Sequence, residues 1–206
     1  MKRKIYVLFL CLGLSAAVLA TAQQVQNPVA LLPLDNNGVI VQLPSIPLSG
    51  SPSVNGSLIL GIGTQSNNQP SGVTAFPANQ SAEFTVTFNG TSYRSSFIDS
   101  GSNGLFFPSA SQVPNCHTFS DWFCPSSTVS LSATNTGASG SPSGSVSFQM
   151  GNFESLINSI NNVFPDIGGT FSSGFDWGLP FFFGRNVHVG LEGKVSILGT
   201  GPYWAY

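Results

Sequence analysis

Charged residues are scarce in this sequence. Lys and Arg together number 6 and Asp and Glu number 8, so that the four types make up 7% of the 206 residues. A protein that binds nucleic acid needs a basic face to match the phosphate backbone. With 6 basic and 8 acidic residues, this sequence is too poor in basic residues to form such a face. We therefore expect no nucleic-acid partner.

Long apolar runs are equally scarce, and the one that exists lies at the N-terminus. It extends from Ile5 to Leu19, follows the basic stretch Lys2 to Lys4 and ends in the small residues Ala20 to Ala22. This pattern predicts a secretory signal peptide over residues 1–22. The alternative, an uncleaved membrane anchor, is disfavoured because the run is short for a span. We expect an exported chain, periplasmic or extracellular, with no membrane span after cleavage.

Cysteine occurs three times, and one of the three lies within the predicted signal. The remaining pair, Cys116 and Cys124, lies eight residues apart. In an oxidising compartment such a pair predicts a disulfide that closes a small loop. The alternative is a metal pair with His117, but the sequence offers no second ligand cluster of the usual spacing. We expect neither a metal nor a cofactor.

Prolines divide the remaining chain. Residues 23–57 contain five of them, which forbid a long helix and confine strands to short or edge positions. We expect this Pro-rich segment to pack on a single lobe that spans residues 58–206. A buried strand is predicted near the start of that lobe, at 58–63, where an apolar run ends in a Gly-rich turn.

Alternating apolar residues predict an all-β lobe with one short helix. Asn89-Gly90 marks a tight hairpin within 84–98, and a second hairpin over 126–150 has a Gly- and Ser-rich tip. The tip, between residues 134 and 145, is expected to be mobile and to cover a groove. The helix would present one apolar face, end before Pro165 and begin at the N-cap Asn152. Its face is formed by Phe153, Leu156, Ile157, Ile160 and Phe164, and further strands are predicted at 105–107, 181–184, 187–191 and 195–198.

One acidic residue, Asp99, follows an apolar strand directly and precedes Ser100-Gly101. An Asp-Ser-Gly tripeptide is often only a turn whose carboxylate binds its own backbone. Here the chain runs from one apolar strand through the turn and into another at 105–107. A lone carboxylate at the edge of a core is costly, so Asp99 is the strongest candidate for chemistry.

The stretch Phe97-Ile98-Asp99-Ser100-Gly101-Ser102 resembles the active-site turn of aspartic proteases. Phe182-Phe183-Gly184 resembles the second half of that signature, and the continuation through Arg185 and Asn186 resembles the retropepsin branch. The resemblance implies a closed β-barrel lobe of the pepsin or retropepsin type. It also implies that the strand before Gly184 threads a wide loop beside the turn, and that Asp99, Ser100 and Gly101 are catalytic.

Longer strings resemble the uncharacterised exported bacterial proteins of domain-of-unknown-function family 3443. They are LILGIGTQSNN, SFIDSGSNGLFF and GLPFFFGRNVHVG, and the likeness runs from about Gln26 to the C-terminus. Members of this family generally carry an upstream lobe with its own Asp turn, whereas this sequence has one such turn and is expected to join the signal directly to the second lobe.

A single Asp turn matters because aspartic proteases use two carboxylates that share one proton. The other candidate acids lack the Ser/Thr-Gly sequel; they are Asp35, Asp121, Asp166 and Asp176. The second carboxylate is therefore expected from a homodimer or from a missing partner lobe.

Two classes of function remain open. The first is an aspartic-type endopeptidase that uses Asp99, requires a second lobe or a dimer and takes a peptide. The second is a non-catalytic binding or structural module of the cell envelope. A serine-type triad is disfavoured, since His117 and His188 come with no Gly-x-Ser-x-Gly elbow. His188 alternates with two valines, and we expect it to face solvent.

Overall fold

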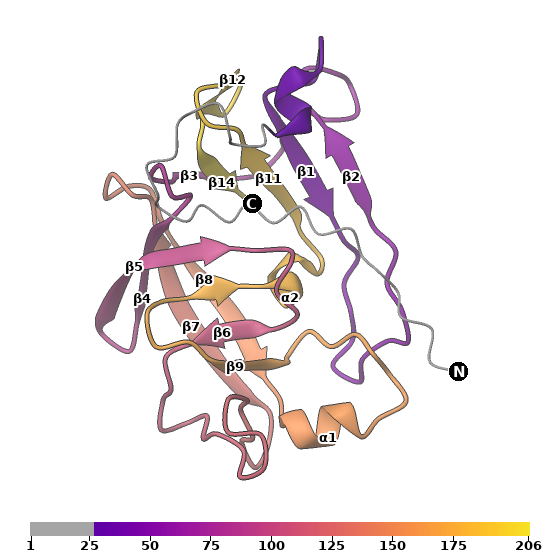
Figure 1. Cartoon of the computed structure of the whole chain (residues 1–206), viewed down its shortest axis with the longest axis vertical. Helices are drawn as coiled ribbons and strands as arrows, with labels where there is room; N and C mark the ends of the chain where they lie inside the picture. Colours follow the sequence, from indigo (N-terminus) through magenta and orange to yellow (C-terminus); the bar gives the residue numbers. More distant parts are fainter. Residues whose placement is uncertain (1–26) are drawn as a thin grey trace.

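The structure, a computed structural model, describes residues 27–206 as two main β-sheets with short helices (Figure 1). The predicted signal peptide, residues 1–22, lies outside the described residues. The strands are β1 (Gly38–Gln42), β2 (Ser57–Leu60), β3 (Ala75–Pro77), β4 (Phe84–Phe88), β5 (Thr91–Ile98), β6 (Leu105–Phe107), β7 (Val129–Thr136), β8 (Ser143–Met150), β9 (Gly168–Thr170), β10 (Asp176–Trp177), β11 (Asn186–Gly190), β12 (Val195–Ser196), β13 (Gly199–Thr200) and β14 (Tyr203–Ala205). The helices are η2 (Pro28–Leu31), α1 (Phe153–Ile157) and α2 (Leu179–Phe182).

The Pro-rich segment contributes a central strand of the five-stranded sheet, whose order is β2-β1-β11-β14-β3. β1 pairs with β2 on one side and with β11 on the other, so it is not an edge strand; of the two positions expected, short or edge, it has the first, with a length of 5 residues. β1 itself contains no proline, which leaves its backbone N–H groups free to pair on both sides. The predicted buried strand, β2, is instead an exposed edge, where Leu58 is 62% exposed.

The second sheet has seven strands in the order β8-β7-β4-β5-β10-β6-β9. It curls into a half-barrel rather than the closed barrel that was expected, because β8 and β9 remain its two edges (Figure 1). Both predicted hairpins are present. Asn89 and Gly90 have positive φ angles of 50° and 79°, as a two-residue turn between β4 and β5 requires.

Aromatic side chains fill the hollow of this sheet. The ring of Phe107 lies 5.5 Å from that of Phe88, 4.8 Å from Phe123 and 5.3 Å from Phe175. Trp177 is fully buried beside Phe175. Each such side chain contributes about 2–3 kcal/mol through burial, so this cluster fixes the strands that carry the Asp99 turn.

The helix α1 is shorter than the sequence pattern predicts. Asn152 caps α1 as predicted, accepting the Ser155 N–H at 3.0 Å, but the helix ends at Ile157 and Ile160 is 92% exposed. The chain leaves the helix because residues further on pair with the N-terminal segment, where Ser51 and Val163 exchange backbone hydrogen bonds of 2.9 Å.

The predicted strand at 181–184 is largely the helix α2. Pro180 lies in the first turn of α2, where its missing N–H costs nothing. The prediction that His188 faces solvent was wrong. His188 lies in β11, between β1 and β14, and is only 2% exposed. Its Nδ1 lies 3.2 Å from the Ala205 carbonyl oxygen. Within residues 27–206 no helix has the length and apolarity needed to cross a membrane.

Candidate functional site

The Asp99 turn connects two strands that do not pair directly with each other. β10 lies between them, parallel to β5 and antiparallel to β6. The Asp99 N–H donates to the Trp177 carbonyl oxygen at 3.0 Å, so the turn spans the end of β10. Figure 1 shows the short strand that leads into α2 inserted between β5 and β6.

The Asp99 carboxylate is held by its own turn. Oδ1 accepts the Gly101 N–H at 2.8 Å, and the Ser102 hydroxyl oxygen lies 3.2 Å from Oδ2. Asp99 and Gly101 are half-buried, and Ser100 is exposed. The predicted residues Asp99, Ser100 and Gly101 therefore form one turn whose carboxylate is oriented by two donors and remains accessible to solvent.

The glycine that approaches this turn is Gly178, whereas Gly184 was predicted. A Cβ on Gly178 would lie 2.0 Å from the Gly104 carbonyl oxygen and 2.8 Å from that of Ser102. Gly184 lies elsewhere, with its N–H donating to the Leu43 carbonyl oxygen at 3.0 Å. The threading strand was missed because its apolar run is interrupted by an acid, in Phe175-Asp176-Trp177-Gly178.

The other residues of the predicted second motif surround α2 rather than the Asp99 turn. Phe182 and Phe183 are buried at its end. Arg185 donates to the Phe181 carbonyl oxygen at 2.6 Å, and its guanidinium lies 4.6 Å from the centre of the Phe181 ring. Burial lowers the pKa of Arg185. Asn186 accepts a hydrogen bond from the Gln42 amide at 2.9 Å.

A second carboxyl group, that of Asp176, belongs to the same site. Its Oδ2 lies 2.5 Å from the Ser102 hydroxyl oxygen, its side chain is 9% exposed, and its Oδ1 is buried without a hydrogen-bond partner. Burial raises the pKa of Asp176 to about 7; the Ser102 hydrogen bond opposes the rise and the nearby Asp99 charge adds to it. Sequence reasoning set Asp176 aside for lack of a Ser/Thr-Gly sequel. The available signal was an acid between two buried aromatic residues.

A pocket of about 480 Å³ lies between β8, α2 and the loop at 45–48, and none of residues 99–102 lines it. Its walls are mainly apolar, with Arg185 as the charged group. The residues that line it are Ser45, Ile46, Leu48, Leu105, Ser130, Val146, Ser147, Phe148, Gln149, Pro165, Trp177, Pro180, Phe181, Phe183 and Arg185.

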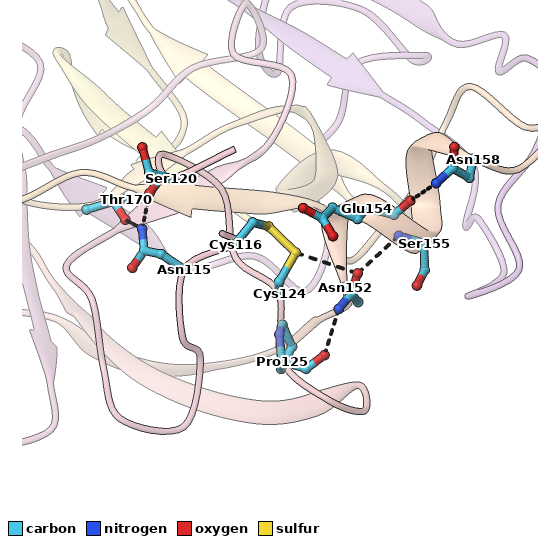
Figure 2. Close-up of a disulfide and its surroundings, with 10 residues drawn as sticks. All are labelled: Asn115, Cys116, Ser120, Cys124, Pro125, Asn152, Glu154, Ser155, Asn158 and Thr170. Atoms are coloured by element: carbon cyan, nitrogen blue, oxygen red, sulfur yellow. Dashed lines mark hydrogen bonds between the residues drawn. A yellow bond between two sulfur atoms is a disulfide. The ribbon is translucent and has the colours of Figure 1, made fainter. Parts of the chain in front are cut away.

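Cys116 and Cys124 form the predicted disulfide, with a Cα–Cα distance of 4.8 Å (Figure 2). Glu154 lies close by, within 4.8 Å of both sulfur atoms. The metal-pair alternative is not supported, since the two sulfur atoms are bonded to each other and offer no thiolate ligand. Asn152 donates to the Pro125 carbonyl oxygen at 3.1 Å and so ties the disulfide loop to α1.

The comparisons with known proteins agree with the motif strings. The model of the family described as "Protein of unknown function (DUF3443)" matches residues 4–206. The chain belongs to this family. No curated protein and no solved structure matches the chain.

Proposed function

We propose that this DUF3443 protein is an exported aspartic-type endopeptidase module in which Asp99 supplies one of two catalytic carboxyl groups. The observation that carries the proposal is the half-buried Asp99 carboxylate, held by the Gly101 N–H and facing Ser102. Support also comes from β10, which lies between β5 and β6 and ends in the close-packed Gly178. Resemblance to the aspartic-protease lobe had led us to expect a strand and glycine of this kind.

The chemistry would follow from two carboxyl groups that share one proton. One carboxylate activates a water molecule, and the protonated partner polarises the scissile carbonyl. The Gly101 N–H donor would fix the direction of the free lone pairs of the Asp99 carboxylate. The partner carboxyl that faces the same water would come from a second copy, through an isologous interface, or from an upstream lobe.

The test is peptide hydrolysis by the mature chain between about pH 3 and 7, read by mass spectrometry on a mixed peptide library. The oligomeric state is measured under the same conditions. Asp99→Asn keeps the shape of the side chain and removes the acid, so it should abolish cleavage. Asp121→Asn is the matched control, because Asp121 is exposed and lies outside the site. Equal cleavage by all three proteins, or an inactive dimer, would contradict the proposal.

A second candidate, a non-catalytic peptide-binding module, is favoured by the position of the pocket. β8 is an edge strand and its residues 146–149 line the pocket, so an extended peptide would pair with this edge. Arg185 lies in the same pocket and would receive a carboxylate. Fluorescence anisotropy with a labelled peptide, with its C-terminus free or amidated, tests this. Binding should weaken on amidation and in Arg185→Met, and remain unchanged in Asp99→Asn.

A further inference from the structure

The hydroxyl group of Ser102 lies between two carboxyl groups of the same chain. Its oxygen is 3.2 Å from Asp99 Oδ2 and 2.5 Å from Asp176 Oδ2. A serine hydroxyl has one proton, so it can donate to one of these oxygen atoms only. If both carboxyl groups were ionised, the Ser102 hydroxyl would donate to one of them, and its oxygen would face the other carboxylate oxygen with no proton between them. The arrangement therefore requires a second proton in the group.

The second proton belongs on Asp176. Its side chain is 9% exposed and its Oδ1 has no partner, whereas Asp99 is half-buried and accepts the Gly101 N–H. Burial disfavours the charged form of a carboxyl group, and backbone donors favour it. A neutral Asp176 donates its O–H to the Ser102 oxygen, and Ser102 then donates to the Asp99 carboxylate.

We propose that Asp176 is a positioning residue that, while protonated, acts through Ser102 to hold a hydrogen-bond donor on Asp99. When Asp176 loses its proton to solvent, its carboxylate competes for the Ser102 proton, and Asp99 Oδ2 loses its donor. Protonation of Asp176 would thus control, within a single chain, whether the Asp99 carboxylate has a hydrogen-bond donor. The consequence for peptide hydrolysis rests on the proposed function.

The groups around Asp176 leave Asp99 as its principal charged neighbour. β6 and α2 contain no titratable side chain, and β5 contributes Tyr93 and the exposed Arg94, which precede the turn by several residues. Among charged groups, Asp99 is the one that acts on the pKa of Asp176, which burial raises to about 7. A hydrogen-bonded chain of three side chains from β10 and the Asp99 turn accounts for the coupling.

Carboxyl carbon-13 NMR of the mature chain, labelled at aspartate, tests the proposal without any need for hydrolysis. Asp176 should titrate near neutral pH, and the Asp99 signal should show an inflection at the same pH. That inflection should vanish in Ser102→Ala, which breaks the chain, and in Asp176→Asn, whose amide N–H is a permanent donor. It should persist in Asp166→Asn, the matched control, because Asp166 is also buried with a raised pKa, whereas the Ser102 hydroxyl group contacts Asp99 and Asp176.

The proposal is overturned if Asp176 titrates below about pH 5, or if the Asp99 carbon-13 signal responds in the same way in Ser102→Ala and in the unaltered chain at the pH where Asp176 loses its proton. Should Asp176→Asn fail to fold, Ser102→Ala decides the matter alone. If the chain hydrolyses peptides, the alkaline limb of its pH–rate profile should move to higher pH in Asp176→Asn and stay in place in Asp166→Asn. An inactive dimer with coupled titrations would contradict the proposed peptidase and leave the positioning role intact.

Discussion

The indole N–H of Trp177 donates to the Asn135 side-chain oxygen at 3.2 Å, and so joins the strand beside Asp99 to the hairpin β7–β8. The Asn135 amide in turn donates to the Tyr206 hydroxyl oxygen at 2.7 Å. Asn135 is fully buried, and satisfied polar groups in such a position specify one arrangement of the surrounding core. The two hydrogen bonds of Asn135 therefore anchor the hairpin β7–β8 to β10 and to the C-terminal residue Tyr206.

Replacing Asn135 by Leu should destabilise the fold. The substitution leaves the Trp177 N–H and the Tyr206 hydroxyl without their partner, and each unsatisfied buried group costs about 1–3 kcal/mol. We expect a fall of roughly 2–5 kcal/mol in the free energy of unfolding, measured by urea denaturation. The control is Asn67→Leu in the exposed loop at 64–67, which should change it by less than about 0.5 kcal/mol. Equal effects would mean that the Asn135 contacts contribute nothing.

The mobile tip of the hairpin should be short. β7 and β8 stay paired as far as Thr136 and Ser143, and the Ala138 N–H donates to the Pro77 carbonyl oxygen at 2.7 Å. Limited proteolysis should therefore cut at 138–141, inside the 134–145 range that the composition indicated. Cleavage mapped by mass spectrometry within the paired arms would show that the hairpin opens further than its hydrogen bonds suggest.

Local sequence patterns predicted both hairpins, but of the two carboxyl groups at the candidate site they predicted one, that of Asp99. Asn89-Gly90 and strict alternation carry their own geometry, and the Cys116–Cys124 disulfide followed from spacing and compartment. Asp99 was found because its turn has a local signature. Asp176 was missed because a two-residue strand has no periodicity to read, and its neighbours in space come from β5 and β6.

Tertiary pairing also explains the misplaced elements. Residues after Ile157 keep the apolar spacing of a helix, but the chain there is held by Ser51 through backbone hydrogen bonds to Val163. The sequence pattern at Phe181 and Phe182 predicts a strand, yet Pro180 lies at the start of a helical turn and both rings pack in the main hydrophobic core. In each case contacts with distant segments overrode the local pattern.

Removing the disulfide should lower stability without changing the fold. Cross-linking two residues at a separation of 8 restricts the unfolded chain by about 2–3 kcal/mol on the chain-entropy model. The paired substitution Cys116→Ser and Cys124→Ser should reduce the free energy of unfolding by that amount. Thiol labelling of residues 23–206, unreduced and denatured, should find no reactive group. Two labelled thiols per chain would contradict the prediction.

The two glycines of the competing motifs should respond differently to alanine. At Gly178 the new Cβ would meet backbone oxygen atoms at 2.0 and 2.8 Å, so β10 or the Asp99 turn must move. At Gly184 it would meet the Ser45 side chain at 2.5 Å, in a residue with φ of 76°. A side chain can rotate away, which leaves a backbone cost of about 1–2 kcal/mol.

We therefore expect Gly178→Ala to unfold the chain or shift the Asp99 NMR signals, and Gly184→Ala to leave those signals unchanged. Gly72→Ala, which has a positive φ and no atom within 4 Å of the new Cβ, controls for backbone strain alone. A Gly184 variant that disturbs Asp99 more than the Gly178 variant does would restore the motif assignment made from sequence.

The raised pKa of Asp176 should appear as a pH dependence of stability. The folded chain keeps its proton up to about pH 7, whereas an unfolded aspartate releases it near pH 3.9. Between these values the folded state binds more protons than the unfolded state, so this group's contribution is complete below about pH 4 and is lost as pH rises toward 7. Three pH units correspond to at most about 4 kcal/mol.

Asp176→Asn should therefore gain stability relative to the unaltered chain as pH rises through this window, measured by urea denaturation at each pH. Asp166 shares the direction of shift, so Asp166→Asn should remove a separate part of the same slope. Burial lowers the pKa of His188, and this contribution to the slope has the opposite sign. A stability difference between Asp176→Asn and the unaltered chain that stays constant from pH 4 to pH 7 would show that Asp176 ionises in the fold as it does in water.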